Sequence, residues 1–84
     1  MKLAKYVKFR EEKFGGVLFE TRSEKVYTLT PTAAAVVQEI QAGRPAEEIA
    51  PRLAQRFEGA DGAIERDVNA FLAELRAKGL VEEG

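Results

Sequence analysis

Hydrophobic and polar residues alternate along the first third of the chain, which is the period of β-strands. The segments with this character are residues 5–11, 16–21 and 25–29. In the first of them, Val7 and Phe9 share one side and polar residues take the other. Gly15 and Gly16 follow, and we expect the tight turn there, since glycine readily adopts positive φ angles. The pattern predicts an antiparallel three-stranded meander, which leaves an edge strand unpaired.

The remaining residues repeat their apolar positions every three to four residues, which is typical of amphipathic helices. Thr30 and Pro31 are suited to the N-cap and first turn of a helix that ends at Gly43. Pro45 opens a second helix, in which Pro51 predicts a kink or a restart near Ala50. The stripes expected to face inward are Ala33, Val36, Val37 and Ile40, then Ile49, Leu53 and Phe57, then Ile64, Val68, Phe71, Leu72 and Leu75.

The third helix has the clearest end signal in the sequence. We expect it to follow a loop at residues 58–61, to be capped by Asp61 or Gly62, and to end near Lys78. Gly79 then takes the left-handed conformation that stops a helix, and Leu80 folds back on Leu75 in a Schellman motif. Residues 82–84 should fray. The elements together predict an α+β fold, a three-stranded antiparallel sheet followed by three helices, winged-helix-like, in a single domain spanning residues 1–84.

Composition excludes several classes of function. The 84 residues contain no cysteine and no histidine, so the usual nucleophile–base pairs and the commonest metal ligands are missing. The acidic pairs at residues 11–12, 47–48 and 82–83 fit solvated surfaces better than a catalytic dyad. No apolar run is long enough to span a membrane, and lysines interrupt the N-terminal segment where a signal peptide would be apolar. We expect a cytoplasmic protein that is neither an enzyme nor a binder of metal or cofactor.

The charge is unevenly distributed. Residues 1–30 hold seven Lys/Arg and four Asp/Glu, a net +3, and residues 31–84 hold six and ten, a net −4. A winged-helix domain that binds DNA normally presents a basic helix. Here the third helix carries both signs on its exposed side, so a DNA-binding or transcription-regulatory domain stays open only as an alternative, and we expect no nucleic-acid partner.

An unpaired strand beside a helix is also what peptide binding requires, because the edge offers backbone hydrogen bonds and the neighbouring groove accepts alternate side chains. The third strand and third helix could line such a groove. Their candidates are Val26, Tyr27, Leu29, Ile64, Phe71 and Leu75. For most of these residues the alternative is a place in the core. Phe71 and Ile64 are the residues that could serve both roles.

Four segments in order resemble the PqqD-like family: VKFREE and GGVLF at residues 7–12 and 15–19, KVYTLT at 25–30, and a close of the form D-V-x-x-F-L-x-x-L-x-x-x-G-L at 67–80. Thr30 stands where that family often has asparagine. The resemblance implies a recognition element for ribosomally made precursor peptides (a RiPP recognition element). The leader segment of the precursor would add as a strand beside the third strand, against the third helix.

The resemblance also implies the site and the partners. Carried over by position, the peptide-binding residues are Lys25, Val26, Tyr27, Thr28, Leu29, Ile64, Asp67, Phe71, Glu74 and Lys78. The domain would present the precursor to a radical SAM maturase or another modifying enzyme, and any iron–sulfur cluster would belong to that partner. We expect a monomer or a weak dimer, since an exposed edge strand can also pair between copies.

Overall fold

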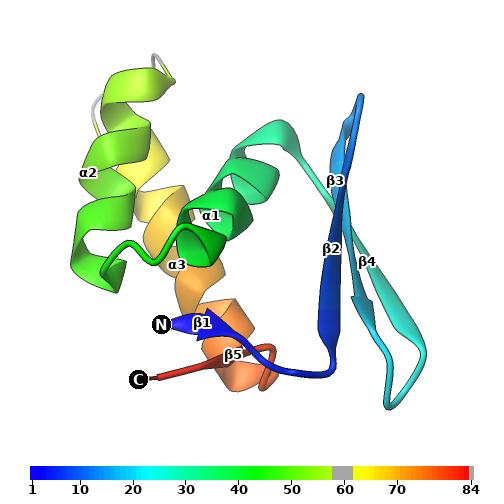
Figure 1. The fold of residues 1–84 in the computed structure, drawn as a ribbon. Coiled ribbons are helices and arrows are strands. Elements are labelled where there is room, and N and C mark those ends of the chain that lie inside the picture. Colours follow the sequence, from blue (N-terminus) through cyan, green and yellow to red (C-terminus); the bar gives the residue numbers. More distant parts are fainter. Residues whose placement is uncertain (58–61, 84) are drawn as a thin grey trace.

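The computed structural model describes residues 1–57 and 62–83. Its main sheet consists of β2 (Val7–Glu12), β3 (Gly15–Glu20) and β4 (Lys25–Leu29), paired antiparallel in the order β2-β3-β4. Leu18 in β3 stands between Phe9 of β2 and Tyr27 of β4. Three helices follow, and all of them lie on one side of this sheet (Figure 1). The predicted fold, an antiparallel three-stranded sheet followed by three helices, is confirmed.

The first hairpin turn lies two residues earlier in the chain than predicted. Glu12 pairs with Gly15, so the two turn residues are Lys13 and Phe14, and Gly15 and Gly16 begin β3. The glycines are needed for close packing. A Cβ on Gly15, whose φ is +141°, would lie 2.2 Å from the Leu29 carbonyl oxygen. Gly16 likewise leaves room for the Phe9 ring, which would be 2.7 Å from an added Cβ.

The helices are α1 (Pro31–Gln41), α2 (Ala46–Arg56) and α3 (Ala63–Ala77). Thr30 is the N-cap of α1 as predicted, and its hydroxyl accepts a hydrogen bond from the Ala33 amide at 3.2 Å. The end of α3 also matches the prediction. Gly79 has a φ of +71°, and the Leu80 amide donates to the Leu75 carbonyl at 3.0 Å, which is the long hydrogen bond of a Schellman motif.

Helix α2 does not restart near Ala50, where the sequence predicts a kink or a new beginning. The helix runs from Ala46 to Arg56 with Pro51 inside it. Pro51 is exposed, whereas Ile49 and Leu53 are fully buried on the opposite side. The packing of that buried side against α3 offsets the hydrogen bond that proline removes. Gly62 is the N-cap of α3, and Asp61 with the expected loop at residues 58–61 lies outside the described residues.

The two ends of the described chain pair with each other. Strand β1 (Lys2–Leu3) is antiparallel to β5 (Val81–Glu82), so the expectation that Glu82 frays is wrong. Figure 1 shows the two short strands side by side next to the C-terminal end of α3. The Tyr6 hydroxyl adds a long-range tie by donating to the Gly79 carbonyl at 2.6 Å.

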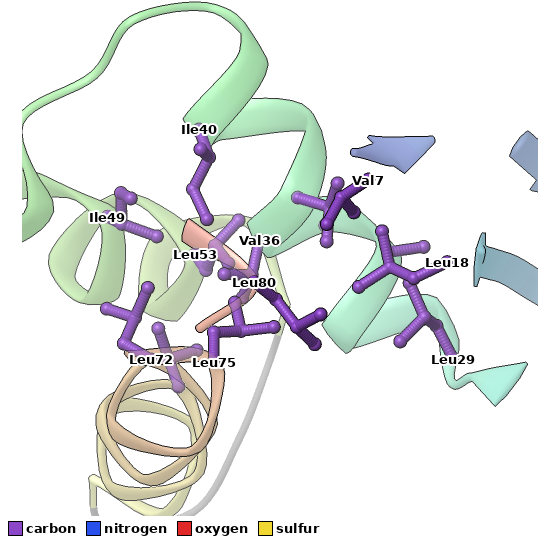
Figure 2. Close-up of a cluster of buried hydrophobic side chains, with 14 of the residues drawn as sticks. Val7, Leu18, Leu29, Val36, Ile40, Ile49, Leu53, Leu72, Leu75 and Leu80 are labelled. Atoms are coloured by element: carbon purple, nitrogen blue, oxygen red, sulfur yellow. The ribbon is translucent and has the colours of Figure 1, made fainter. Parts of the chain in front are cut away.

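One continuous core joins the sheet to the helices. Its members come from every layer, as Figure 2 shows for Val7, Leu18, Leu29, Val36, Ile40, Ile49, Leu53, Leu72, Leu75 and Leu80. Among the described residues, one carboxylate, that of Glu39 in α1, is buried with this core. It accepts a hydrogen bond from Arg52 of α2 at 2.7 Å and lies 3.7 Å from the Arg44 guanidinium, so its charge is compensated and its role is structural.

None of the helices described is long and apolar enough to cross a membrane.

Candidate functional site

A hollow of about 500 Å³ lies between the edge strand β4 and helix α3. It is lined by Tyr27, Thr28, Leu29, Thr30, Thr32, Ala33, Val36, Asp67, Val68, Phe71 and Glu74. Strand β4 pairs only with β3 in the described part of the chain, so its other edge is open. We call this hollow the β4–α3 cleft.

The inner lining of the cleft is apolar and belongs to the core. Leu29, Val36 and Val68 are at most 3% exposed, so they close the cleft from beneath. Phe71 of α3 and Tyr27 of β4 are only half-buried, and they pack on the core while part of each side chain faces the cleft. An apolar side chain that enters the cleft therefore meets apolar atoms without displacing any core residue.

The outer rim of the cleft is polar. Thr30 and Thr32 contribute hydroxyl groups, and helix α3 contributes the carboxylates of Asp67 and Glu74. Thr28 borders the cleft through its backbone, because its side chain lies on the same face of the sheet as that of Val26. A rim of this kind surrounds an apolar interior in many ligand sites, where the interior gives affinity and the rim fixes orientation.

A cation lies beside the cleft. The Lys78 ammonium donates to Glu74 at 2.9 Å and stands 5.5 Å from the centre of the Tyr27 ring. The hydrogen bond from Lys78 to Glu74, together with the charge of that carboxylate, raises the pKa of Lys78. Lys78 lines a smaller hollow of about 20 Å³ that also includes Tyr27 and Glu74, so it borders the cleft without lining it.

Six of the ten residues predicted for peptide binding line the cleft together: Tyr27, Thr28, Leu29, Asp67, Phe71 and Glu74. Lys25, Val26 and Ile64 do not line it. Ile64 is half-buried against the core, and Lys25 stands opposite Glu20 in the neighbouring strand.

Val26 lies on the other face of the sheet, because side chains alternate along a strand. It is 60% exposed and lines a separate hollow of about 370 Å³. That hollow is formed with Lys8, Phe9, Arg10, Val17 and Phe19. No helix covers this face in Figure 1. A role for Val26 in peptide binding would therefore have to use its backbone and not its side chain.

Five residues of the cleft were missing from the predicted set: Thr30, Thr32, Ala33, Val36 and Val68. From the sequence, Thr30 is expected to cap a helix, and Ala33, Val36 and Val68 are expected to face inward on their helices. Their second role depends on how α1 packs against α3 and β4, which is a tertiary feature. The start of α1 had a usable signal, since Thr30 and Pro31 fix where the strand must end.

Comparison with known proteins places the chain in a family. The family model described as "Coenzyme PQQ synthesis protein D (PqqD)" matches residues 15–81, which is most of the sequence. The chain belongs to the PqqD family. A search of curated protein sequences gives no match.

Two solved structures resemble this PqqD-family chain over almost its whole length. One is described as TbiB1 in complex with the TbiA(beta) leader peptide, with a TM-score of 0.83, 23% identity, and coverage of 100% of this chain and 98% of that one. The other is a lasso peptide synthetase B1 complexed with the leader peptide, with a TM-score of 0.80, 27% identity, and coverage of 98% and 96%. Both likenesses show that this chain shares its fold with those proteins.

Proposed function

We propose that this PqqD-family chain is a RiPP recognition element that binds the leader segment of a ribosomally made precursor peptide. The observation that carries the proposal is the β4–α3 cleft, where an open strand edge and an apolar hollow lie together. An extended peptide needs both, the edge for backbone hydrogen bonds and the hollow for alternate side chains. Two proteins of the same fold are described in complex with leader peptides, which supports this choice of ligand.

The peptide adds to β4 as a fourth strand of the main sheet. Backbone groups of residues 25–29 supply the hydrogen bonds, so Lys25 and Val26 take part through the main chain whatever their side chains face. Every second peptide side chain then points under α3, toward Phe71 with Asp67 and Glu74 at the rim. Lys78 borders the end of this track beside Tyr27.

The bound precursor is then presented to a modifying enzyme. The chain acts as a binding partner and supplies no catalytic group, in keeping with its lack of cysteine and histidine. A radical SAM maturase is the class of enzyme that we propose, and the gene neighbourhood tests it. A radical SAM gene and a short peptide gene beside this one would support the proposal, and a neighbourhood with a different modifying enzyme would change the class of partner.

Strand addition predicts that peptide binding changes one edge of the main sheet, β4, and leaves the other edge, β2, unchanged. The ¹⁵N-labelled chain is titrated with a synthetic peptide covering the leader of the precursor encoded beside it, with a scrambled peptide as control. We expect shifts in β4 and α3, and slower hydrogen exchange for those β4 amides that face the open edge. Strand β2, the opposite edge of the same sheet, serves as the internal control and should not gain protection. Shifts confined to α2, with β4 silent, would contradict the proposed site.

A further inference from the structure

The two carboxylates on the rim of the cleft differ in what lies beside them. Glu74 has a partner one helical turn away, since Lys78 follows it by four residues and bonds to it at 2.9 Å. Asp67 has no ion pair among the described residues. The reason is visible in the sequence. The positions three and four residues from Asp67, which are the neighbours on a helix surface, are Ala63, Ile64, Ala70 and Phe71.

The surroundings of Asp67 in the cleft also lack a cation. The polar groups that line the cleft with it are the threonine hydroxyls and Glu74, whose charge Lys78 compensates. Lys78 is eleven residues further along α3, roughly 16 Å away at 1.5 Å per residue. Asp67 is thus a negative charge at the mouth of an apolar hollow, and no lysine or arginine of the described residues forms an ion pair with it.

Spacing relates this charge to the apolar part of the site. Phe71 is one helical turn from Asp67, which places their Cβ atoms about 5–6 Å apart. Residues two apart in an added strand point to the same side and are separated by roughly 6.6 Å. A peptide strand under α3 can therefore place one side chain against Phe71 and the next inward-facing one against Asp67.

We infer that Asp67 selects leader peptides that carry a lysine or arginine two residues from the apolar side chain that packs against Phe71. This inference rests on the proposed function and adds to it the charge and spacing of the ligand. A carboxylate in the peptide at that position would face Asp67 without a compensating cation and is disfavoured. Glu74 is not expected to select a cation in the peptide, because it already accepts a hydrogen bond from Lys78.

An unbiased selection tests the inference without knowledge of the natural leader. A display library of random twelve-residue peptides is selected on the full chain and on two variants, Asp67→Lys and Glu65→Lys. Glu65 is an exposed carboxylate in the same part of α3 that does not line the cleft, so it matches the change in net charge. Selected peptides are assigned to the cleft by chemical shifts in β4 and α3, and thermal unfolding checks that both variants are folded.

We expect the unaltered chain and Glu65→Lys to enrich lysine or arginine two positions from an apolar residue, and Asp67→Lys to enrich aspartate or glutamate there. For one enriched peptide, Asp67→Asn should weaken binding about two- to fivefold, the range for an exposed ion pair. Replacing the lysine or arginine of the peptide by glutamine should weaken binding to the unaltered chain by the same factor. In the Asp67→Asn variant the same replacement should cause no further loss of affinity. The preference should shrink as salt is raised.

The opposing outcomes separate the inference from the proposed function. Cleft binders with no charge preference, or the same preference with Asp67→Lys, would overturn the inference and leave peptide binding intact. A selection that yields no peptide shifting β4 and α3 would overturn the proposed function, and the inference with it. A preference that Glu65→Lys also reverses would show a general effect of charge and would count against Asp67 as the selecting group.

Discussion

Replacing Phe71 by alanine probes the cleft, and the adjacent Leu72 provides a matched control on the same helix. Phe71 is half-buried and lines the cleft, whereas Leu72 is 3% exposed and belongs wholly to the core. The two substitutions differ by one position in α3, so their distances from the helix ends are nearly the same. Differences between them report what each side chain contacts.

The expected losses of stability follow from burial. Full burial of a phenylalanine is worth about 1.5–3 kcal/mol, so a half-buried one should lose about 1–2 kcal/mol on truncation. Leu72→Ala also leaves a cavity, and about 3–5 kcal/mol is expected. A chain of this length has a free energy of unfolding of roughly 4–13 kcal/mol, so Phe71→Ala should remain folded. Urea unfolding followed by circular dichroism measures both losses.

Peptide affinity should show the reverse order. Phe71→Ala removes an aromatic wall of the cleft, and we expect the leader peptide to bind at least about fivefold more weakly by calorimetry. Leu72→Ala should bind within about twofold of the unaltered chain wherever it is folded, since no cleft atom is lost. A loss of stability for Phe71→Ala as large as that for Leu72→Ala, with unchanged affinity, would show that Phe71 is purely a core residue and would refute the reasoning.

Three further predictions concern the fold and its chemistry. Gly15→Ala should destabilise far more than Gly43→Ala, because an added Cβ would lie 2.2 Å from the Leu29 carbonyl oxygen in the first case and meets no atom within 4 Å in the second. Thermal unfolding measures both losses of stability. Gly43→Ala should cost only about 1–2 kcal/mol, the penalty for a non-glycine residue in the left-handed conformation. Equal losses for the two variants would contradict the packing argument. The Ser23 hydroxyl donates to Glu20 and lowers the pKa of that carboxyl, so its stabilising effect is present above the unfolded pKa and is lost as pH falls through the folded one. Ser23→Ala should raise the pKa of Glu20 toward its ordinary value in an NMR titration, and an unchanged pKa would oppose this assignment. The washed, tag-free chain should carry no stoichiometric transition metal by mass spectrometry, since it has no cysteine or histidine, and one bound equivalent would count against this.

Several parts of the site were predictable because their signals are local. Alternation over residues 25–29 matches β4, and the stripe of α3 predicts the burial of Val68 and Leu72. Phe71, which was expected to serve both the core and the groove, is half-buried. The open edge follows from having only three strands in a meander. The position of the cleft was harder to predict, since Val36 and Val68 read as ordinary core residues until α1 and α3 are placed beside β4.

The sequence by itself determined which segments form the main sheet and the three helices, and where α1 begins and α3 ends. A cap needs only neighbouring residues, so Thr30 and Pro31 mark the start of α1, and Gly79 with Leu80 marks the end of α3. The family signal is also carried by the order of short segments along residues 15–81.

Tertiary structure decided what depends on distant residues. The glycines at the start of β3 belong to a strand because Gly15 must pass close to the Leu29 carbonyl, a contact that no turn rule contains. Strands β1 and β5 have two residues each, too short for any periodic signal, and they form only because folding brings the two ends of the chain together. The cleft is of the same kind: its apolar lining comes from helices α1 and α3 and from strand β4, and only their packing leaves a hollow beside an open edge.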